Sequence, residues 1–158
     1  MSAREVRAHT ALHVLKGAVV RMLGPRKTLY AVASGNRGTL VVEMDRSPSS
    51  KELWSVEDAA NRAIIENLDV VQFEMEKQEA EGHYGDSIYD TPPDPALTLL
   101  TIVMIPDWEV TCCSSKHVEK TGEIEGLGFE RITYTRAKNQ LELRFFVNES
   151  APGDAGKA

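Results

Sequence analysis

Four side chains of types that bind transition metals form two pairs with the same spacing. His9 and His13 are four residues apart near the start of the chain, and Cys113 and His117 are four residues apart about a hundred residues later. On a helix, this spacing places two side chains one turn apart on the same face, where both can reach one ion. Three imidazoles and one thiolate form a nitrogen and sulfur ligand set that suits zinc. The two pairs therefore predict a zinc site, provided that the fold brings them together.

Each pair alone also has a simpler interpretation. Histidines on an apolar helix face are more often core or capping residues than metal ligands, and a cysteine beside another cysteine is usually a small buried residue. The two pairs occur together in a chain with only four histidines, which favours the metal site over these alternatives. The fourth, His83, lies near a predicted turn and receives no role. His9 is followed by Thr10 rather than by glutamate, so the His-Glu-x-x-His pattern of metalloproteases is absent.

The first pair lies in a segment with a clear helical pattern. Apolar residues recur at helical spacing across residues 4–23 and form one broad face, and Gly24 followed by Pro25 predicts the end of this helix. Residues 28–34 and 38–44 are short apolar runs joined by a glycine-flanked turn, which predicts a β-hairpin. The helix would hold both histidines on one face.

The second pair is expected to lie in a helical turn near the end of a mixed series of helices and strands. After the first hairpin the pattern predicts a helix over 51–67, a strand over 69–75, a short acidic helix over 76–82, a loop over 84–95, a buried strand over 97–105, a helical turn over 115–121 and a hairpin of 127–135 and 140–147. This mixture favours an α+β domain with an antiparallel sheet packed against helices.

Length and composition set the class of protein. The chain has 158 residues with 42% hydrophobic and 27% charged side chains, which is typical of one soluble globular domain. No apolar run is long enough to cross a membrane, and the first seven residues do not resemble a secretory signal, so a cytoplasmic location is expected. The two cysteines, Cys112 and Cys113, are adjacent, which disfavours a disulfide between them.

Charge is distributed unevenly along the chain. The net charge of -6 argues against nucleic-acid binding, but residues 1–51 carry nine basic and three acidic side chains, whereas residues 52–158 carry nine basic and twenty-one acidic ones. A local basic face could meet an RNA partner while the rest of the surface stays acidic. Chance clustering on a mixed surface explains the same numbers, so composition leaves both interpretations open.

Three motifs in this order carry a resemblance to a known family. They are His9-Thr10-Ala11-Leu12-His13-Val14-Leu15, then Cys113-Ser114-Ser115-Lys116-His117-Val118, then Thr121-Gly122-Glu123-Ile124. Together they resemble the free-standing alanyl-tRNA editing proteins called AlaX, which are relatives of the editing domain of alanyl-tRNA synthetase. The editing domain of threonyl-tRNA synthetase shares the fold and the first motif, so the resemblance specifies the class more closely than the substrate.

The resemblance implies a fold, a cofactor and an activity. The fold is the α+β editing domain common to threonyl- and alanyl-tRNA synthetases, and zinc is bound by His9, His13, Cys113 and His117. The activity is hydrolysis of the ester between a wrong amino acid and the terminal adenosine of tRNA, usually serine on tRNA for alanine. A pocket shaped for a small side chain cannot strongly reject an analogue that only adds a hydroxyl, so a second, hydrolytic site removes the error.

A polar turn is the candidate substrate site. Asn36-Arg37-Gly38-Thr39 matches a Gln-Lys-Gly-Ser-like turn of the family, so Asn36 and Thr39 are candidates to bind the serine hydroxyl or to position water. An ordinary hairpin turn explains the same residues. The chain departs from many relatives at Leu12, where they have threonine, and at Ser114-Ser115-Lys116, where Gly-Gly-Thr is common; these changes concern specificity rather than the ligands.

Domain limits and tRNA contacts follow from the same resemblance. His9 lies close to the start, so a small family member is expected, with one zinc-binding editing domain over residues 1–147 and a disordered tail over 148–158. Basic side chains near the site in sequence are candidates to contact tRNA phosphates, although each is also explained as an ordinary surface charge; they are Arg4, Arg7, Lys16, Arg37 and Lys116.

The chemistry has two open forms. Zinc can lower the pKa of a bound water, or it can hold the substrate while a polar group or a substrate hydroxyl orients the water; the second form is slightly favoured, because four protein ligands would close a tetrahedral site. No general base is identified, and a solvated or structural role is favoured for Glu123. The rival functions are a non-catalytic zinc-stabilised RNA-binding module and a zinc hydrolase for a small ester or amide.

Overall fold

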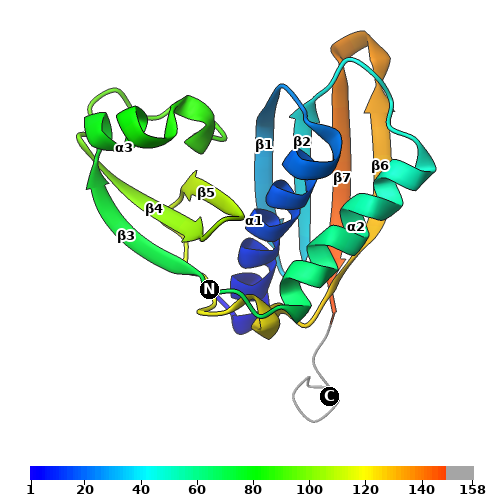
Figure 1. Cartoon of the computed structure of the whole chain (residues 1–158), viewed down its shortest axis with the longest axis horizontal. Helices are drawn as coiled ribbons and strands as arrows, with labels where there is room; N and C mark the ends of the chain where they lie inside the picture. Colours follow the sequence, from blue (N-terminus) through cyan, green and yellow to red (C-terminus); the bar gives the residue numbers. More distant parts are fainter. Residues whose placement is uncertain (149–158) are drawn as a thin grey trace.

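The first helix, α1 (Ala3–Leu23), lies between a small sheet and the rest of the molecule in the computed structural model, which describes residues 1–148 (Figure 1). Its start is fixed by a capping box, in which Ser2 Oγ accepts a hydrogen bond from the Glu5 backbone N–H at 3.1 Å. It ends at Gly24, whose φ of 57° lies in the left-handed region that glycine adopts without steric cost. The predicted first helix is therefore confirmed.

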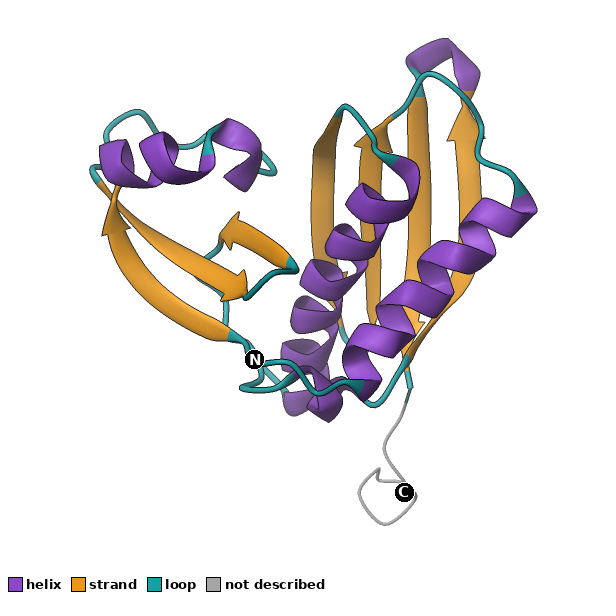
Figure 2. Cartoon of the chain, in the orientation of Figure 1, coloured by secondary structure: helices purple, strands orange, loops and turns teal. Residues whose placement is uncertain are grey.

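The large sheet joins the two predicted hairpins side by side. Its four strands are antiparallel in the order β1-β2-β7-β6, and β2 pairs with β7. Alternate residues of the central strands are buried under α1 and α2 (Ser50–Ile65), which cover one face of the sheet (Figure 2). The strands are β1 (Lys27–Ser34), β2 (Arg37–Glu43), β6 (Leu127–Thr135) and β7 (Gln140–Val147).

The small sheet lies on the other side of α1. It has the antiparallel order β3-β4-β5 and carries its own small core, which the helical segments after β3 help to cover (Figure 1). The elements are β3 (Val71–Glu76), α3 (Lys77–Tyr84), the short 3-10 helix η1 (Asp86–Ile88), β4 (Leu99–Ile105) and β5 (Glu109–Cys112). Because β5 ends at Cys112, the loop that carries Cys113 and His117 begins at the edge of this sheet.

The turn between β4 and β5 docks the small sheet onto α1. Trp108 Nε1 donates a hydrogen bond to the Val14 carbonyl at 2.9 Å, and the Arg21 guanidinium lies 4.1 Å from the indole centroid. Gly17 is required by this close approach, because a Cβ at that position would overlap the indole. The docking brings the end of β5 to the helix face that carries His13.

Two details of the fold differ from the sequence-based expectation. The helical turn predicted over 115–121 is wrong, because the backbone there pairs with the segment before β3; Val70 N–H donates to the Glu119 carbonyl at 2.9 Å. The turn begins later, as the 3-10 helix η2 (Thr121–Ile124). Strand β5 was not predicted, because a strand of four residues carries too little periodicity to be recognised.

The α+β class, with antiparallel sheets packed against helices, is confirmed. The other predicted helices and strands also form, with ends that shift by a few residues. Of the tail predicted to be disordered over 148–158, only Asn148 is described, and its N–H donates to the Gly126 carbonyl at 2.9 Å; residues 149–158 lie outside the described part of the chain. No described helix has both the length and the apolar character needed to span a membrane.

The start of α2 carries a carboxylate whose pKa is lowered by its hydrogen-bond partners. Glu52 accepts hydrogen bonds from the Arg46 guanidinium, at 2.8 and 2.7 Å, and from the Ser49 backbone N–H, and these lower the pKa of its carboxyl from 4.5 to about 2. A carboxylate with a lowered pKa stabilises the fold above pH 4.5, and this contribution is lost as the pH falls towards 2. We expect Glu52→Gln to lower the melting temperature at pH 7 and to differ less from the native protein near pH 2. A difference in melting temperature that is constant across this range would contradict the assignment.

Candidate metal centre

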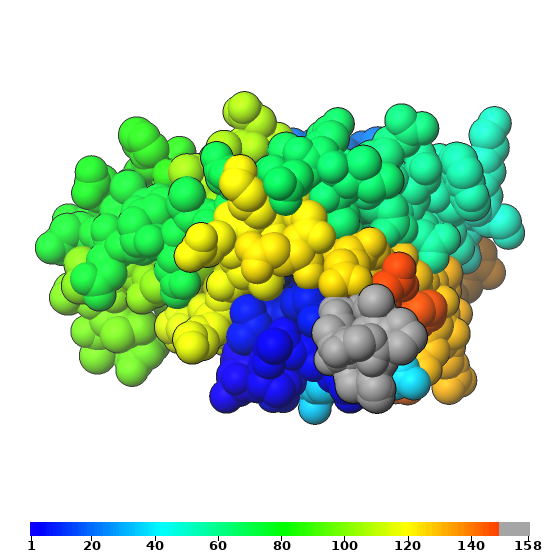
Figure 3. All heavy atoms as spheres, turned by 90° about the horizontal axis from the view of Figure 1, so that it is seen from below, coloured from blue at the N-terminus to red at the C-terminus, as the bar shows by residue number. Residues whose placement is uncertain are grey.

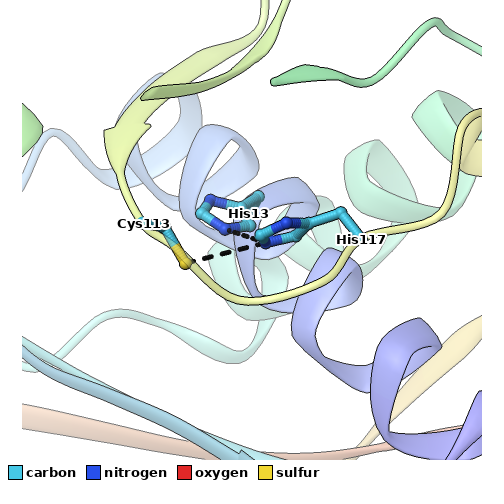
Figure 4. A group of neighbouring side chains, drawn as sticks. All are labelled: His13, Cys113 and His117. Carbon is cyan, nitrogen blue, oxygen red and sulfur yellow. Dashed lines mark hydrogen bonds between the residues drawn. The ribbon is translucent and has the colours of Figure 1, made fainter. Parts of the chain in front are cut away.

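Three of the four predicted ligands meet in space. His13 comes from α1, Cys113 follows β5 directly, and His117 lies in the loop that leads to η2; one ligand atom from each lies within 4.8 Å of the others (Figure 4). The imidazole rings of His13 and His117 are tilted by 60° to each other and bring their Nε2 atoms within 2.9 Å, and Cys113 Sγ lies 3.7 Å from His117 Nε2. Two nitrogen atoms and one sulfur atom that could bind a metal thus lie close together.

The donor set and its spacing fit zinc. A tetrahedral ion with usual bond lengths holds two nitrogen ligands about 3.3 Å apart and a nitrogen and a sulfur ligand about 3.6 Å apart. The observed 2.9 and 3.7 Å separations differ from these values by a few tenths of an ångström, which small side-chain rotations can supply. The arrangement therefore suits a soft or borderline divalent cation.

His9 lies beside this group but outside it. Its ring is perpendicular to that of His117, with 6.4 Å between the centroids, and its ligand atoms are not among those within 4.8 Å of one another. Partial burial lowers the pKa of His9, which favours the neutral imidazole that a metal ligand must have. His9 remains the predicted fourth ligand, one helical turn before His13.

The charges of the group favour a thiolate. Burial by itself raises the pKa of Cys113, but hydrogen bonds and charge from His117 and His13 outweigh burial and lower it. Burial likewise lowers the pKa of His13, and the nearby carboxylate of Glu109 together with Cys113 outweighs burial and raises it. The Cys113 thiolate and the Glu109 carboxylate thus favour positive charge at this point, and a bound cation would supply that charge in place of the proton on His13.

A buried polar network contacts His13 at Nδ1, the ring nitrogen on the side away from the ligand cluster. His13 Nδ1 lies 3.0 Å from Glu109 Oε1, and Lys16 Nζ lies 3.4 Å from Glu109 Oε2, 2.6 Å from Asp90 Oδ1 and 3.1 Å from Thr111 Oγ1. Neither Glu109 nor Asp90 is marked by a local sequence motif. The available signal was Lys16 itself, because a lysine three residues after His13 on an apolar face needs a buried carboxylate partner.

The position of Lys16 also corrects one predicted tRNA contact. Its side chain is only 9% exposed, and its ammonium is paired with Asp90 and Glu109 inside the protein. A phosphate contact would require these buried ion pairs to break, and breaking a buried pair is costly. The prediction that Lys16 contacts a tRNA phosphate is therefore wrong.

The loop that carries the second pair is tied to α1 by a threonine of the first motif. Thr10 Oγ1 accepts a hydrogen bond from the Val118 backbone N–H at 3.0 Å and donates one to the Val6 carbonyl at 2.9 Å. The space-filling view from below shows the residues around 120 lying against the start of α1 (Figure 3). Thr10 therefore sets the distance between the helix and His117.

Removing this hydroxyl should loosen the centre. In Thr10→Val the shape of the side chain is kept, but the buried Val118 N–H loses its acceptor, which costs about 1–3 kcal/mol of unfolding free energy. We expect lower stability in urea and weaker metal binding, whereas Thr10→Ser, which keeps the hydroxyl, should stay near the native values. Equal behaviour of the two variants would show that the hydrogen bond does not position the loop.

The third motif has a structural role. Gly122 N–H donates to Asn67 Oδ1 at 2.9 Å, and a Cβ on Gly122 would overlap that side chain. The Glu123 carboxylate accepts hydrogen bonds from the backbone N–H groups of Glu119 and Lys120, at 3.2 and 3.1 Å. These contacts favour the structural reading of Glu123 and fix the loop downstream of His117.

The candidate substrate residues lie towards the start of α1. The turn between β1 and β2 contacts this helix where Gly35 N–H donates to Glu5 Oε2 at 3.5 Å. Asn36 Nδ2 donates to the Val147 carbonyl at 3.4 Å, and half-buried Thr39 stands in β2. The turn is thus an ordinary hairpin connection in its backbone, and substrate contact by Asn36 and Thr39 remains a prediction.

The remaining basic candidates differ in their surroundings. Arg7 and Lys116 line a hollow of about 750 Å³ that also borders His117, together with Glu119, Glu123 and Glu125. Arg7 Nε is buried and has no hydrogen-bond partner among the described residues. Arg37, in contrast, forms an exposed ion pair with Glu130 at 3.3 Å, and Arg4 is exposed in the first turn of α1; the candidate list is Arg4, Arg7, Arg37 and Lys116.

Comparison with known proteins relates the chain to alanine–tRNA ligases. No protein-family model matches the chain. The chain is 37% identical over 122 residues to the alanine–tRNA ligase of Hyperthermus butylicus, which covers 77% of this chain and 13% of the ligase. It is 35% identical over 136 residues to the Aeropyrum pernix ligase, covering 85% of this chain and 15% of the ligase. It is 32% identical over 150 residues to the Methanopyrus kandleri ligase, which covers 88% of this chain and 16% of the ligase.

These matches cover most of this chain but little of each ligase. The chain spans 13–16% of the length of these relatives, so the similarity concerns a segment of the ligases and not their whole architecture. The chain is therefore related to a segment of alanine–tRNA ligases.

Proposed function

We propose that the protein is a zinc-dependent hydrolase that removes a wrong amino acid from tRNA, with serine on tRNA for alanine as its substrate. The observation that carries the proposal is the convergence of His13, Cys113 and His117 in a chain related to alanine–tRNA ligases. The segment shared with the ligases would then be their editing region, and the chain would act on mischarged tRNA in the cytoplasm as a free-standing editing domain over residues 1–147.

The metal would be held by His9, His13, Cys113 and His117. A bound zinc supplies a Lewis acid that can orient the aminoacyl ester or acidify a water. The residues around it would do the remaining work. Thr10 keeps the ligand loop at a fixed distance from α1, and the thiolate of Cys113 offsets the charge of a divalent cation.

The hollow beside His117 is the proposed place for the end of the tRNA. Arg7 and Lys116 on its rim would contact backbone phosphate, and Arg4 and Arg37 would extend this contact along the start of α1 and the first hairpin. The carboxylates of Glu119 and Glu125 would face the free amino group of the aminoacyl ester. Asn36 and Thr39 would recognise the serine hydroxyl.

The function is tested by supplying seryl-tRNA for alanine and measuring release of serine. We expect release well above the uncatalysed rate, slower release of alanine from the same tRNA, and no comparable cleavage of a small free seryl ester. Binding of the tRNA without release would instead favour a zinc-stabilised RNA-binding module. Equal cleavage of the free ester would identify a small-molecule hydrolase.

A further inference from the structure

We propose that Glu109 is a positioning residue for the metal centre, which fixes the ring of His13 so that Nε2 faces the cation. The inference rests on the proposed function only in taking His13 as a zinc ligand. A histidine that binds metal through one nitrogen commonly donates its other N–H to a carboxylate, which sets the tautomer and the ring orientation. Glu109 is placed to be that carboxylate.

The geometry of His13 separates its two nitrogens clearly. Nδ1 lies 3.0 Å from Glu109 Oε1, on the side of β5, whereas Nε2 lies 2.9 Å from His117 Nε2, on the side of the ligand cluster. A hydrogen bond from Nδ1–H to the carboxylate leaves the lone pair on Nε2 for the metal. The ring could not rotate away from the cluster without giving up this bond.

Glu109 is itself held in place. The residue is 8% exposed at the first position of β5, and its second oxygen lies 3.4 Å from Lys16 Nζ. Lys16 is anchored in turn by Asp90 at 2.6 Å and by Thr111 at 3.1 Å. A buried carboxylate with this support has little freedom to move, so it can impose an orientation on the histidine.

A simple buried ion pair does not explain these contacts as well. The shortest contact of Lys16 is to Asp90, and Glu109 Oε2, although buried, makes no hydrogen bond within residues 1–148. The well-formed hydrogen bond of Glu109 is the one to His13. In contrast, His117 Nδ1 is buried and has no partner among the described residues. Of the two facing histidines, His13 is therefore the one whose orientation the protein fixes.

Zinc affinity separates positioning from a purely structural role. We would measure the zinc dissociation constant of the native protein, Glu109→Asp and Glu109→Gln by competition with a chromophoric chelator. Aspartate keeps the charge but is one methylene too short, and we expect zinc binding about 10–100-fold weaker, as is typical when such a partner is lost. Glutamine keeps the length of the side chain and an oxygen that can accept the hydrogen bond from His13. We expect its zinc affinity to fall by about 3–10-fold, which is less than in the aspartate variant.

Matched controls come from Glu57, a half-buried glutamate on α2 whose carboxylate accepts a hydrogen bond from the Phe129 N–H at 2.9 Å, away from the cluster. Glu57→Asp and Glu57→Gln should lose some thermal stability and keep the native zinc dissociation constant. The absorption spectrum of the cobalt-loaded protein gives a second readout, because a change in ligand orientation shifts its d–d bands. We expect such a shift in the Glu109 variants and none in the Glu57 variants.

The outcomes distinguish this inference from the proposed function. Native zinc affinity and cobalt spectrum in both Glu109 variants would overturn the positioning role, while release of serine from seryl-tRNA would still support the enzyme. Weaker zinc binding in the Glu109 variants of a protein that releases no serine would support positioning and reject the deacylase. A native protein that binds no zinc would overturn both. If Glu109→Asp does not fold, Glu109→Gln decides alone.

Discussion

Replacing His13 with alanine should reduce deacylation of seryl-tRNA by more than about a hundredfold. The reason is that even loss of an outer partner of a metal ligand typically costs about 10–100-fold, and His13 is at the centre of the proposed ligand set. It is the most buried of the three converging residues and faces His117 Nε2 at 2.9 Å. Cys113→Ala should have an effect of the same order, because it removes the only thiolate of the cluster.

The matched control for His13→Ala is His83→Ala. His83 is an exposed histidine on α3 that contacts the ring of Tyr84, and it lies outside the cluster. The measurement is the rate of serine release at equal concentrations of folded protein, with circular dichroism as a check of folding. A His13→Ala variant that is folded and deacylates at the native rate would show that the metal centre is not the catalytic site.

The second large effect is expected from adding or removing zinc. A ligand that binds only the folded state, present at a concentration about one hundred times its dissociation constant, raises the unfolding free energy by about 2.7 kcal/mol. For a chain of this size that corresponds to a rise in melting temperature of about 5–10 °C. Two segments far apart in the sequence meet at the site, α1 and the loop after β5, so loss of the cation should loosen the contact between them.

The measurement is thermal unfolding of chelator-treated protein before and after addition of zinc. Magnesium is the control cation, because it prefers oxygen ligands and should leave the melting temperature unchanged. Cys113→Ala should lose most of the zinc-dependent rise. If zinc and magnesium shift the melting temperature equally, the stabilisation does not arise at the histidine and cysteine cluster.

The parts of the fold that the sequence predicted are those with regular periodicity. The first helix and the final hairpin repeat apolar residues at their own period over many residues, and Gly24 marks the end of α1. Strand β5 escaped because it is short. The helical turn expected after Cys113 also failed, because the loop pairs its backbone with residues 68–70 and with Thr10 Oγ1, which no local pattern reveals.

At the site too, features that depend on local spacing were predicted, whereas contacts between residues far apart in the sequence were not. The equal spacing of the two pairs predicted a common site for four side chains if the fold brought them together; His13, Cys113 and His117 do meet, and His9 lies beside them. Glu109 was not predicted, because its contact with His13 joins residues 96 positions apart and exists only when Trp108 docks β5 onto α1. Lys16 was misread for a related reason, since proximity in sequence does not say whether a side chain points outwards or into the core.

The most direct test is metal analysis of the purified protein together with X-ray absorption at the zinc edge. We predict one zinc per chain, with one sulfur neighbour at about 2.3 Å and nitrogen neighbours at about 2.0 Å. Three nitrogen neighbours would include His9, and two would leave a position for water or substrate. A protein that takes up no zinc, or zinc without a sulfur neighbour, would contradict the assignment of Cys113 and the metal centre built on it.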